Sequence, residues 1–314
     1  MIMQRDEIGE MPMKAEQPVF SAVEQQIVAS MSELLSRAGL TYQGKFAQVN
    51  GQRIHYLEYG EGSPVFLLHG GGAGSAIWFR QIEVLSKSHR VIAPDHPVFG
   101  LSDQVPYEYP YLRTALRYFM GFMDALELKT ADMVGLSLGA QMAIALAIES
   151  PDRVGKLVVI DAAGLGKEFP MLYKLANVPL LGRLVVRPNR WGQDNYFKTM
   201  EVVDSKFADA GAYKQYAFDV TLTDGHGKAM RSSISEVTSF GGQKSVFTDD
   251  ELRSIAAPVL AIWGDGDPLF PVEHGYRLAE LVPSSNLHVI ENARHVPLLD
   301  HPDEVNELIS GFFG

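Results

Sequence analysis

Residues 131–149 of this 314-residue chain read ADMVGLSLGAQMAIALAIE, with the pattern Gly135-Leu136-Ser137-Leu138-Gly139 at their centre. The apolar run 131–134 suits a short buried strand, and the alanine-rich run 139–149 suits a helix. A G-x-S-x-G pattern between a strand and a helix places its serine on a tight, strained turn. The two glycines of the pattern are the small residues that such a turn requires. The stretch therefore predicts a strand, a sharp turn and a helix, with Ser137 as a nucleophile.

Short apolar strands and helices alternate on both sides of this stretch. Asn50-Gly51 is a strong signal for a hairpin between the first two strands. Short buried strands that alternate with helices indicate an α/β fold, in which helices cover both faces of a mostly parallel central sheet. Functional side chains are then expected in loops at the carboxyl ends of the strands. The expected strands span 45–49, 53–59, 65–68, 90–93, 131–134, 157–160, 259–263 and 287–290, and the expected helices span 111–127, 139–149, 273–281 and 302–312.

One long segment interrupts this alternation. Between Asp161 and Val259 we find no convincing strand of the sheet, and apolar clusters are broken by proline and glycine. A connection of this length inside a compact domain is uncommon unless it is functional. We therefore expect a helical cap over residues 165–247, inserted before the penultimate strand. The α/β core would consist of 45–164 and 248–314.

The first 44 residues are expected to precede the core. Residues 1–18 are expected to form a loose tail. Ser21-Ala22-Val23-Glu24 has the form of a capping box, and apolar residues recur at helical spacing after it. We expect an amphipathic helix over 21–38 that packs on the core. Its polar face carries few lysines or arginines, which argues against membrane docking.

A serine nucleophile needs a base and an acid. Of the nine histidines, His295 alone follows the last expected strand in a loop before the final helix. The acid that orients this histidine is expected in WGDGD at 263–267, after the penultimate strand. Asp267 is preferred because it lies further into the loop, Asp265 is expected to stabilise the turn, and Asp161 stays an alternative acid. The resulting chain order of nucleophile, acid and base is the one expected for this arrangement.

The oxyanion of an acyl-transfer reaction needs two N–H donors. One is expected from the backbone of Leu138, directly after the nucleophile. The other is expected in HGGG at 69–72, where Gly71 is the first choice and Gly72 the alternative, because glycine lets the backbone approach a substrate. The glycine run lacks the spacing of phosphate-binding loops, so no nucleotide site is expected. No group of histidines and acidic residues has metal-ligand spacing, so we expect neither a metal nor another cofactor.

The composition restricts the partners of the chain. It contains no cysteine, which excludes disulfides, thiolate metal sites and cysteine nucleophiles. Its formal net charge of -11 disfavours nucleic acids and anionic membrane surfaces as partners. We find no secretory signal and no apolar run that could span a bilayer, so a cytoplasmic protein is expected. The expected partner is a small hydrophobic ester, and a homodimer is compatible with the sequence.

With these residues in place, the chain resembles the α/β-hydrolase superfamily over residues 45–314. Within it, the chain looks most like capped carboxylesterases, monoacylglycerol-lipase-like enzymes and meta-cleavage-product hydrolases, which break a carbon–carbon bond. The last group usually carries asparagine before the nucleophile and tryptophan after the histidine, where this chain has Leu136 and Val296. The superfamily usually has glycine at Val98, so a different backbone is expected there. The resemblance rests on HGGG at 69–72, DHPVFGLSD at 95–103, GLSLG at 135–139, WGDGD at 263–267 and His295.

These observations predict a serine hydrolase that cleaves carboxylic esters through an acyl-enzyme intermediate. Leu136 and Leu138 beside the nucleophile, together with the aromatic and aliphatic residues of the expected cap, indicate a hydrophobic acyl group. The resemblance leaves open a carbon–carbon bond hydrolase of the meta-cleavage-product type. Amide or lactone hydrolysis by the same residues, and a non-catalytic ligand-binding member of the fold, are the remaining alternatives.

Overall fold

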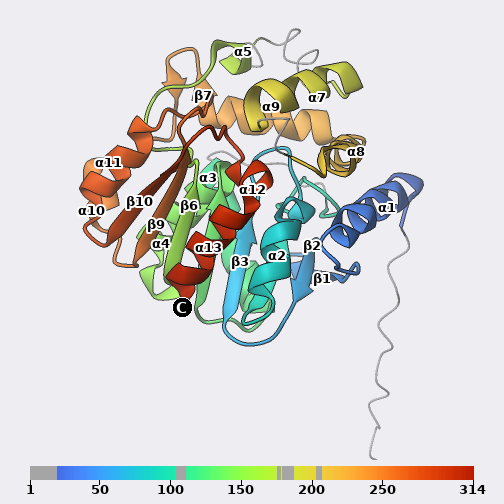
Figure 1. Ribbon diagram of the computed structural model, residues 1–314, viewed down its shortest axis with the longest axis horizontal. Coiled ribbons are helices and arrows are strands. Elements are labelled where there is room, and N and C mark those ends of the chain that lie inside the picture. Colours follow the sequence, from blue (N-terminus) through green and yellow to red (C-terminus); the bar gives the residue numbers. More distant parts are fainter. Residues whose placement is uncertain (1–19, 104–110, 175–177, 179–186, 203–206) are drawn as a thin grey trace, which may run out of the picture.

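A central sheet organises the protein, whose computed structural model describes residues 20–103, 111–174, 178, 187–202 and 207–314. The predicted tail at 1–18 lies outside these residues. Eight strands follow the order β1-β2-β4-β3-β5-β6-β9-β10 (Figure 1). β1 pairs antiparallel with β2 and β2 with β4, whereas all other neighbours pair in parallel, which confirms the predicted sheet. The strands are β1 (Gly44–Val49), β2 (Gln52–Tyr59), β3 (Pro64–Leu68), β4 (Arg90–Pro94), β5 (Ala131–Leu136), β6 (Val154–Ile160), β9 (Val259–Gly264) and β10 (Ser285–Ile290).

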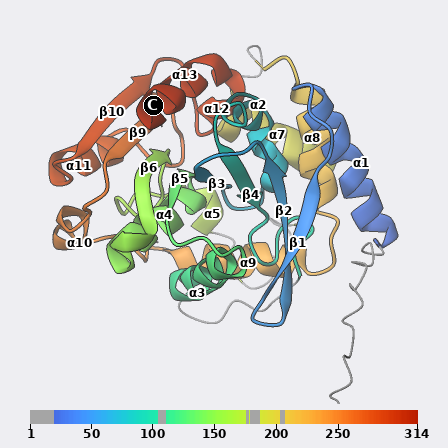
Figure 2. The same ribbon diagram turned by 90° about the horizontal axis from the view of Figure 1, so that it is seen from below.

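Helices cover both faces of the sheet, as Figure 2 shows along the strands. Successive side chains of a strand point to opposite faces, so β3 divides its apolar residues between two cores. Val65 and Leu67 join one hydrophobic cluster, and Phe66 and Leu68 join the other. The first cluster packs against α2 (Phe79–Leu85), α12 (Pro297–Asp300) and α13 (Pro302–Phe313), and the second against α3 (Tyr111–Ala125), α4 (Leu138–Glu149), α10 (Asp249–Arg253) and α11 (Glu273–Leu281).

The predicted hairpin between β1 and β2 is present. Asn50 and Gly51 have φ angles of 51° and 79°, as a two-residue hairpin turn of this sequence requires. Among the described elements that pack on the central sheet, sequence reasoning missed five short ones: η1 (Ser75–Trp78), α2, η2 (Pro151–Arg153), α10 and α12.

The N-terminal helix α1 (Ala22–Ser36) begins with the predicted capping box. The Glu24 N–H donates to Ser21 Oγ at 3.2 Å, and the Ser21 N–H donates to Glu24 Oε2 at 2.7 Å. Ile27 and Met31 are fully buried in the first hydrophobic cluster. The helix also packs on α8 (Ala210–Val220), where Gln26 Nε2 donates to Asp219 Oδ1 at 2.7 Å. It therefore contacts the segment inserted between β6 and β9.

That segment is called here the β6–β9 insertion, and it lies over one end of the sheet, at the top of Figure 1. Its two short strands pair only with each other, so its described part adds no strand to the central sheet. The division into a cap at 165–247 and a core at 45–164 and 248–314 stays a prediction. None of the described helices is long and apolar enough to cross a bilayer. Besides α8, the insertion contains α5 (Met171–Lys174), α7 (Arg190–Tyr196), the π-helical turn η4 (Phe197–Glu201), α9 (His226–Val237), β7 (Thr238–Ser239) and β8 (Gly242–Gln243).

Candidate active site

Ser137 lies on the turn between β5 and α4 with φ of 55° and ψ of -114°. A positive φ is strained for any residue with a Cβ, and such strain persists only where the surroundings enforce it. A Cβ added at Gly135 would lie 2.5 Å from Ala140 Cα, and one added at Gly139 would lie 2.2 Å from the Leu68 carbonyl oxygen. Both distances are far inside van der Waals contact. The two glycines of the motif thus permit the close packing of strand, turn and helix.

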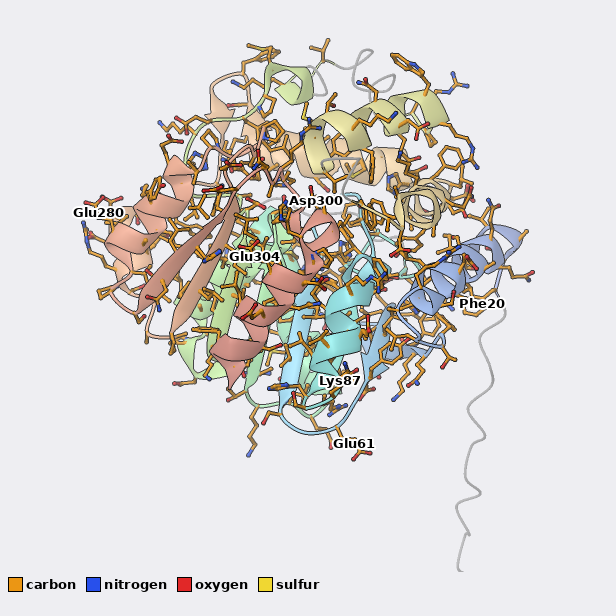
Figure 3. The ribbon with its side chains drawn as sticks, viewed as in Figure 1. Phe20, Glu61, Lys87, Glu280, Asp300 and Glu304 are labelled. Atoms are coloured by element: carbon orange, nitrogen blue, oxygen red, sulfur yellow. The ribbon has the colours of Figure 1, made fainter. Side chains whose placement is uncertain are left out.

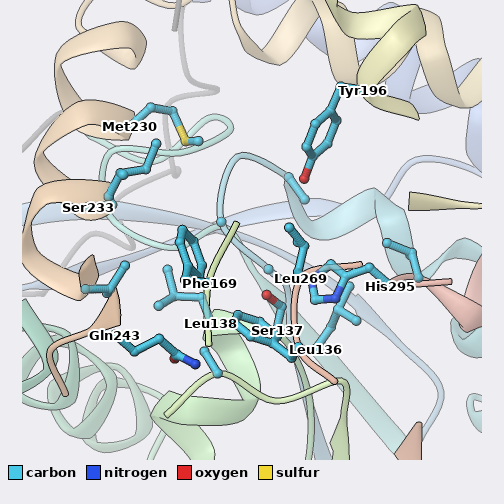
Figure 4. Close-up of a pocket in the computed structure, with 18 of the residues that line it drawn as sticks. Leu136, Ser137, Leu138, Phe169, Tyr196, Met230, Ser233, Gln243, Leu269 and His295 are labelled. Atoms are coloured by element: carbon cyan, nitrogen blue, oxygen red, sulfur yellow. The ribbon is translucent and has the colours of Figure 1, made fainter. Parts of the chain in front are cut away.

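Backbone hydrogen bonds hold this turn against the neighbouring strand. The Ser137 N–H donates to the Ile160 carbonyl at 2.9 Å, and the Ala163 N–H donates to the Ser137 carbonyl at 3.2 Å. The backbone of the serine is therefore anchored on both sides, and its side chain borders the cavity shown in Figure 4.

His295 follows β10 and borders the same cavity. Its Nδ1 lies 2.8 Å from Asp267 Oδ2, while Asp267 Oδ1 accepts the N–H groups of Leu269 at 2.7 Å and Phe270 at 3.2 Å. A carboxylate can only accept hydrogen bonds, so this geometry places the imidazole proton on Nδ1 and leaves Nε2 as a base. The structure thus brings His295 and Asp267 into direct contact and brings His295 and Ser137 to one cavity.

The alternative acid, Asp161, lies behind this pair. It follows β6, is fully buried, and its Oδ1 accepts the Gly264 N–H at 3.0 Å. Polar atoms of Asp161, Asp267 and His295 all lie within 4.8 Å of one another. Burial, followed by the charge of Asp267, raises the pKa of the Asp161 carboxyl well above its usual value. The contact with Nδ1 favours Asp267 as the acid.

Asp161, Asp267 and His295 are the only group of three or more described histidine and acidic residues whose ligand atoms lie this close together. The Nδ1 atom of His295 is already hydrogen bonded to Asp267. The absence of a metal at this group stays a prediction. Asp265 lies in the turn after β9, where its N–H donates to the Ile290 carbonyl at 3.1 Å, and its expected role in stabilising that turn stays a prediction.

The two expected oxyanion donors lie on adjacent segments at the cavity. Leu138 is the first residue of α4, so helix geometry leaves its N–H without an intrahelical acceptor. Gly71 borders the cavity, and a Cβ added to it would lie 3.6 Å from Leu138 Cδ2. Gly72 has φ of 79° and is not among the lining residues, so Gly71 remains the first choice.

Two buried histidines hold the glycine loop, a role that sequence reasoning missed. His69 Nδ1 lies 2.7 Å from the Gly70 carbonyl, and His69 Nε2 accepts the His96 N–H at 3.0 Å. His96 Nε2 lies 2.8 Å from the His69 carbonyl. Burial lowers the pKa of both imidazoles, which keeps them neutral. The histidine of the HGGG motif thus orients the loop that presents Gly71.

The following loop contains Val98, which has φ of 70°. This is the left-handed region that glycine adopts most readily, so the valine keeps a glycine-like backbone. The expectation of a different backbone at this position was wrong. The surrounding hydrogen bonds, from the Val98 N–H to the Asp103 carbonyl at 3.2 Å and from the Phe99 N–H to the His96 carbonyl at 2.9 Å, explain how the turn is held.

The cavity itself measures about 820 Å³ including its open mouth. Its polar lining side chains are Ser137, Tyr196, Ser233, Gln243 and His295, and none of the other described lining residues is polar or charged. The remaining lining residues are Gly70, Gly71, Ala73, Ile77, Leu136, Leu138, Ala163, Phe169, Met230, Ile234, Val237, Leu269, Phe270 and Val296.

The β6–β9 insertion supplies much of this lining. In Figure 4, Tyr196 and Met230 reach into the cavity from the side opposite Ser137. Gln243 is held by its own hydrogen bonds, because its Oε1 accepts the Gly164 N–H at 2.8 Å and its Nε2 donates to the Glu168 carbonyl at 3.2 Å. The sequence predicted an apolar cover but gave no signal for which of its side chains face the serine.

Two arginines of the insertion lie close to its helices, and either could pair with an acidic group only if it faced the cavity. Arg187 and Arg190 are both exposed, and neither lines the cavity. The Arg190 guanidinium lies 4.2 Å from the centre of the Phe218 ring and donates to Gln215 Oε1 at 3.2 Å. These arginines therefore provide no positive charge in the described lining.

The chain is similar to known proteins over most of its length. The sequence pattern of the alpha/beta hydrolase fold matches residues 63–302. The chain belongs to the α/β-hydrolase fold family. Its α/β-hydrolase relatives include the 2-hydroxy-6-oxo-6-phenylhexa-2,4-dienoate hydrolase of Comamonas testosteroni, which is 30% identical over 283 residues, with 85% of this chain and 95% of the relative covered.

Two solved α/β-hydrolase structures are similar to this protein over most of their own length. The meta-cleavage product hydrolase of Pseudomonas fluorescens IP01 has a TM-score of 0.74 at 28% identity, and the match covers 86% of this chain and 97% of the hydrolase chain. A carboxylesterase of Bacillus subtilis has a TM-score of 0.78 at 25% identity, and the match covers 93% of this chain and 99% of the carboxylesterase chain. The comparisons support hydrolase activity and do not separate ester cleavage from carbon–carbon cleavage.

Proposed function

We propose that the protein is a serine hydrolase that cleaves uncharged carboxylic esters with a hydrophobic acyl group. The observation that carries this proposal is the cavity at Ser137 and His295, whose other described lining residues bear no charge. An uncharged ester enters such a cavity without a large desolvation cost. Each buried methylene of its acyl group contributes about 0.8 kcal/mol.

The proposed reaction is a two-step acyl transfer to water. Ser137 Oγ attacks the ester carbonyl carbon while His295 Nε2 takes its proton, and Asp267 stabilises the imidazolium through Nδ1. The N–H groups of Leu138 and Gly71 hold the oxyanion. The alcohol leaves with the proton from His295, and a water molecule, activated by the same imidazole, releases the acid from Ser137.

Carbon–carbon hydrolysis is the second candidate, and the Comamonas testosteroni relative favours it. The dienoate in that relative's name carries a carboxylate. The lining that we describe offers no lysine or arginine to such a group, and Leu136 and Val296 add apolar surface beside the nucleophile and the base. An unpaired buried charge costs roughly 3–5 kcal/mol. We therefore rank the uncharged ester first.

A matched pair of substrates tests the charge argument. p-Nitrophenyl valerate and p-nitrophenyl hemisuccinate have acyl groups of similar length, but only the second carries a carboxylate. From the cost above, we expect kcat/KM for the valerate to exceed that for the hemisuccinate by at least about 100-fold. A series from acetate to palmitate then measures the acyl length that fills the cavity. The Ser137→Ala variant is the control, and it should fold normally and show no turnover.

Three results would contradict the proposal. Equal turnover by Ser137→Ala would refute the assigned nucleophile. Faster cleavage of 2-hydroxy-6-oxo-6-phenylhexa-2,4-dienoate than of any ester would make the protein a carbon–carbon hydrolase. Binding of esters without turnover by the folded parent would identify a non-catalytic ligand-binding protein.

A further inference from the structure

Asp161 has an unusual environment for an acidic residue. Its Oδ1 accepts the Gly264 N–H, but its Oδ2 is buried and has no hydrogen-bond partner in the described part of the chain. A buried ionised oxygen without a donor costs several kcal/mol, so such groups ordinarily bind a donor or hold a proton. The residue also has φ of 44°, a strained value for aspartate. Its N–H donates to the Ile262 carbonyl at 3.1 Å, which holds this strained residue against β9.

The groups that face Asp161 are mostly acidic. Asp267 comes from the loop after β9, His295 from the loop after β10, and Asp300 from α12, labelled in Figure 3. Carboxylates this close cannot all ionise in a buried site, so one of them keeps its proton. Asp267 accepts three N–H donors, from His295, Leu269 and Phe270. Asp161 accepts one, and burial and the neighbouring charges raise its pKa.

We propose that Asp161 is a positioning residue that keeps its proton and donates a hydrogen bond from Oδ2 to the Asp267 carboxylate behind His295. This inference rests on the proposed function, because it assigns His295 as the base of that reaction. The hydrogen bond fixes the carboxylate that orients the imidazole, and it draws some negative charge away from the imidazole. Loss of the bond leaves Asp267 more basic, and His295 then holds its proton to higher pH.

The pair of variants Asp161→Asn and Asp161→Ala tests the protonated form. Asparagine keeps an oxygen for the Gly264 N–H and places an amide donor where the protonated Oδ2 lies. We expect Asp161→Asn to retain kcat/KM within about 3-fold. Asp161→Ala should lose roughly 10- to 100-fold in kcat, as expected for a hydrogen bond to a charged group. In that variant the acid limb of the kcat/KM pH profile should also move to higher pH.

Folding must be separated from positioning in this comparison. Circular dichroism and labelling of Ser137 by a fluorophosphonate give the fraction of folded sites, and rates are expressed per labelled site. A merely structural role would lower that fraction without moving the acid limb. An unmoved acid limb in Asp161→Ala, or full kcat per labelled site, would overturn the proposal. A loss of about 10,000-fold in Asp161→Asn, the typical size for removing the acid of a catalytic triad, would make Asp161 the ionised acid instead.

A second experiment removes the charge that keeps Asp161 protonated. In Asp267→Asn, Asp161 is free to ionise as the pH rises and to replace part of the lost negative charge near His295. We expect Asp267→Asn to retain activity that keeps increasing with pH above the acid limb of His295, and Asp161→Asn/Asp267→Asn to fall at least a further 10-fold and to level off above that limb. Equal activities and equal pH profiles of the two would refute the pairing of these residues.

An infrared measurement distinguishes failure of this proposal from failure of the proposed function. A protonated carboxyl has its own carbonyl stretching band, which does not depend on turnover. We expect this band in the parent at pH 8 and its loss in Asp161→Asn. If no ester is cleaved but the band is present and lost as expected, the protonated Asp161 stands while the ester proposal fails. Absence of the band in the parent would overturn the protonated Asp161.

Discussion

Adding one methyl group at Gly139 is expected to damage both the fold and the reaction. A Cβ in Gly139→Ala would lie 2.2 Å from the Leu68 carbonyl oxygen and 2.6 Å from the His69 carbonyl oxygen. Ordinary carbon–oxygen contacts are about 3.3–3.6 Å, so these backbone atoms must move by roughly 1 Å. Backbone atoms yield less readily than a flexible side chain. We therefore expect a loss of about 3 kcal/mol in the free energy of unfolding, the upper end for overpacking.

The displaced carbonyls belong to the end of β3 and to the loop that presents Gly71. If the Gly71 N–H, the proposed oxyanion donor, shifts with them by about 1 Å, the rate should fall about 100-fold. Urea denaturation and kcat/KM on the best p-nitrophenyl ester measure the two losses. The control is Gly211→Ala in α8, where an added Cβ meets nothing within 4 Å. That variant should gain about 0.5–1 kcal/mol and keep its activity, because alanine suits a helix better. A Gly139→Ala protein as stable and active as the parent would refute the close approach of these segments.

Three further predictions concern side chains away from the serine. Burial lowers the pKa of His226 to about 4, so the unfolded chain binds its proton first as the pH falls. The parent should lose about 3 kcal/mol of stability between pH 6.5 and 4 from this group, and His226→Gln should lose that much less in pH-dependent denaturation. Met31→Ala, at a fully buried position of α1, should cost about 2–5 kcal/mol in thermal or urea unfolding, and an unchanged midpoint would show that the helix is dispensable. His69→Leu should lower kcat about 10-fold or more, because the imidazole no longer bonds to the Gly70 carbonyl and the His96 N–H. A kcat equal to that of the parent would show that the glycine loop keeps its conformation without these two hydrogen bonds.

The sequence predicted those parts of the fold in which local patterns agree with the tertiary environment. The capping box at Ser21, the Asn50-Gly51 turn and the strand-turn-helix at Ser137 depend on neighbours in the chain, and all three are present. The helix α2 was missed because it directly follows η1 and has no side-chain cap at its start. Phe79, Ile82 and Leu85 have helical spacing and could have indicated it.

The candidate site could be predicted only in part. The sequence proposed Asp267 and Asp161 as alternatives, whereas the structure places both beside His295. Their proximity follows from the pairing of β6 with β9, across which Ile160 aligns with Ile262. No local pattern encodes that pairing between segments so distant in the chain. The cavity residues of the insertion, such as Tyr196, have the same limitation, because short helices without a repeating apolar pattern do not reveal the direction of their side chains.

The position of α1 and the first two strands has a consequence for chimeric proteins. The family pattern begins at residue 63, after α1, β1 and β2. A fragment cut there would turn β4 into an open sheet edge and would strip α1 from α8. Open edges invite pairing with other chains. A graft of this protein onto another α/β-hydrolase should therefore include α1, β1 and β2, because the unit that must be moved together is longer than the residues 63–302 that the family pattern matches.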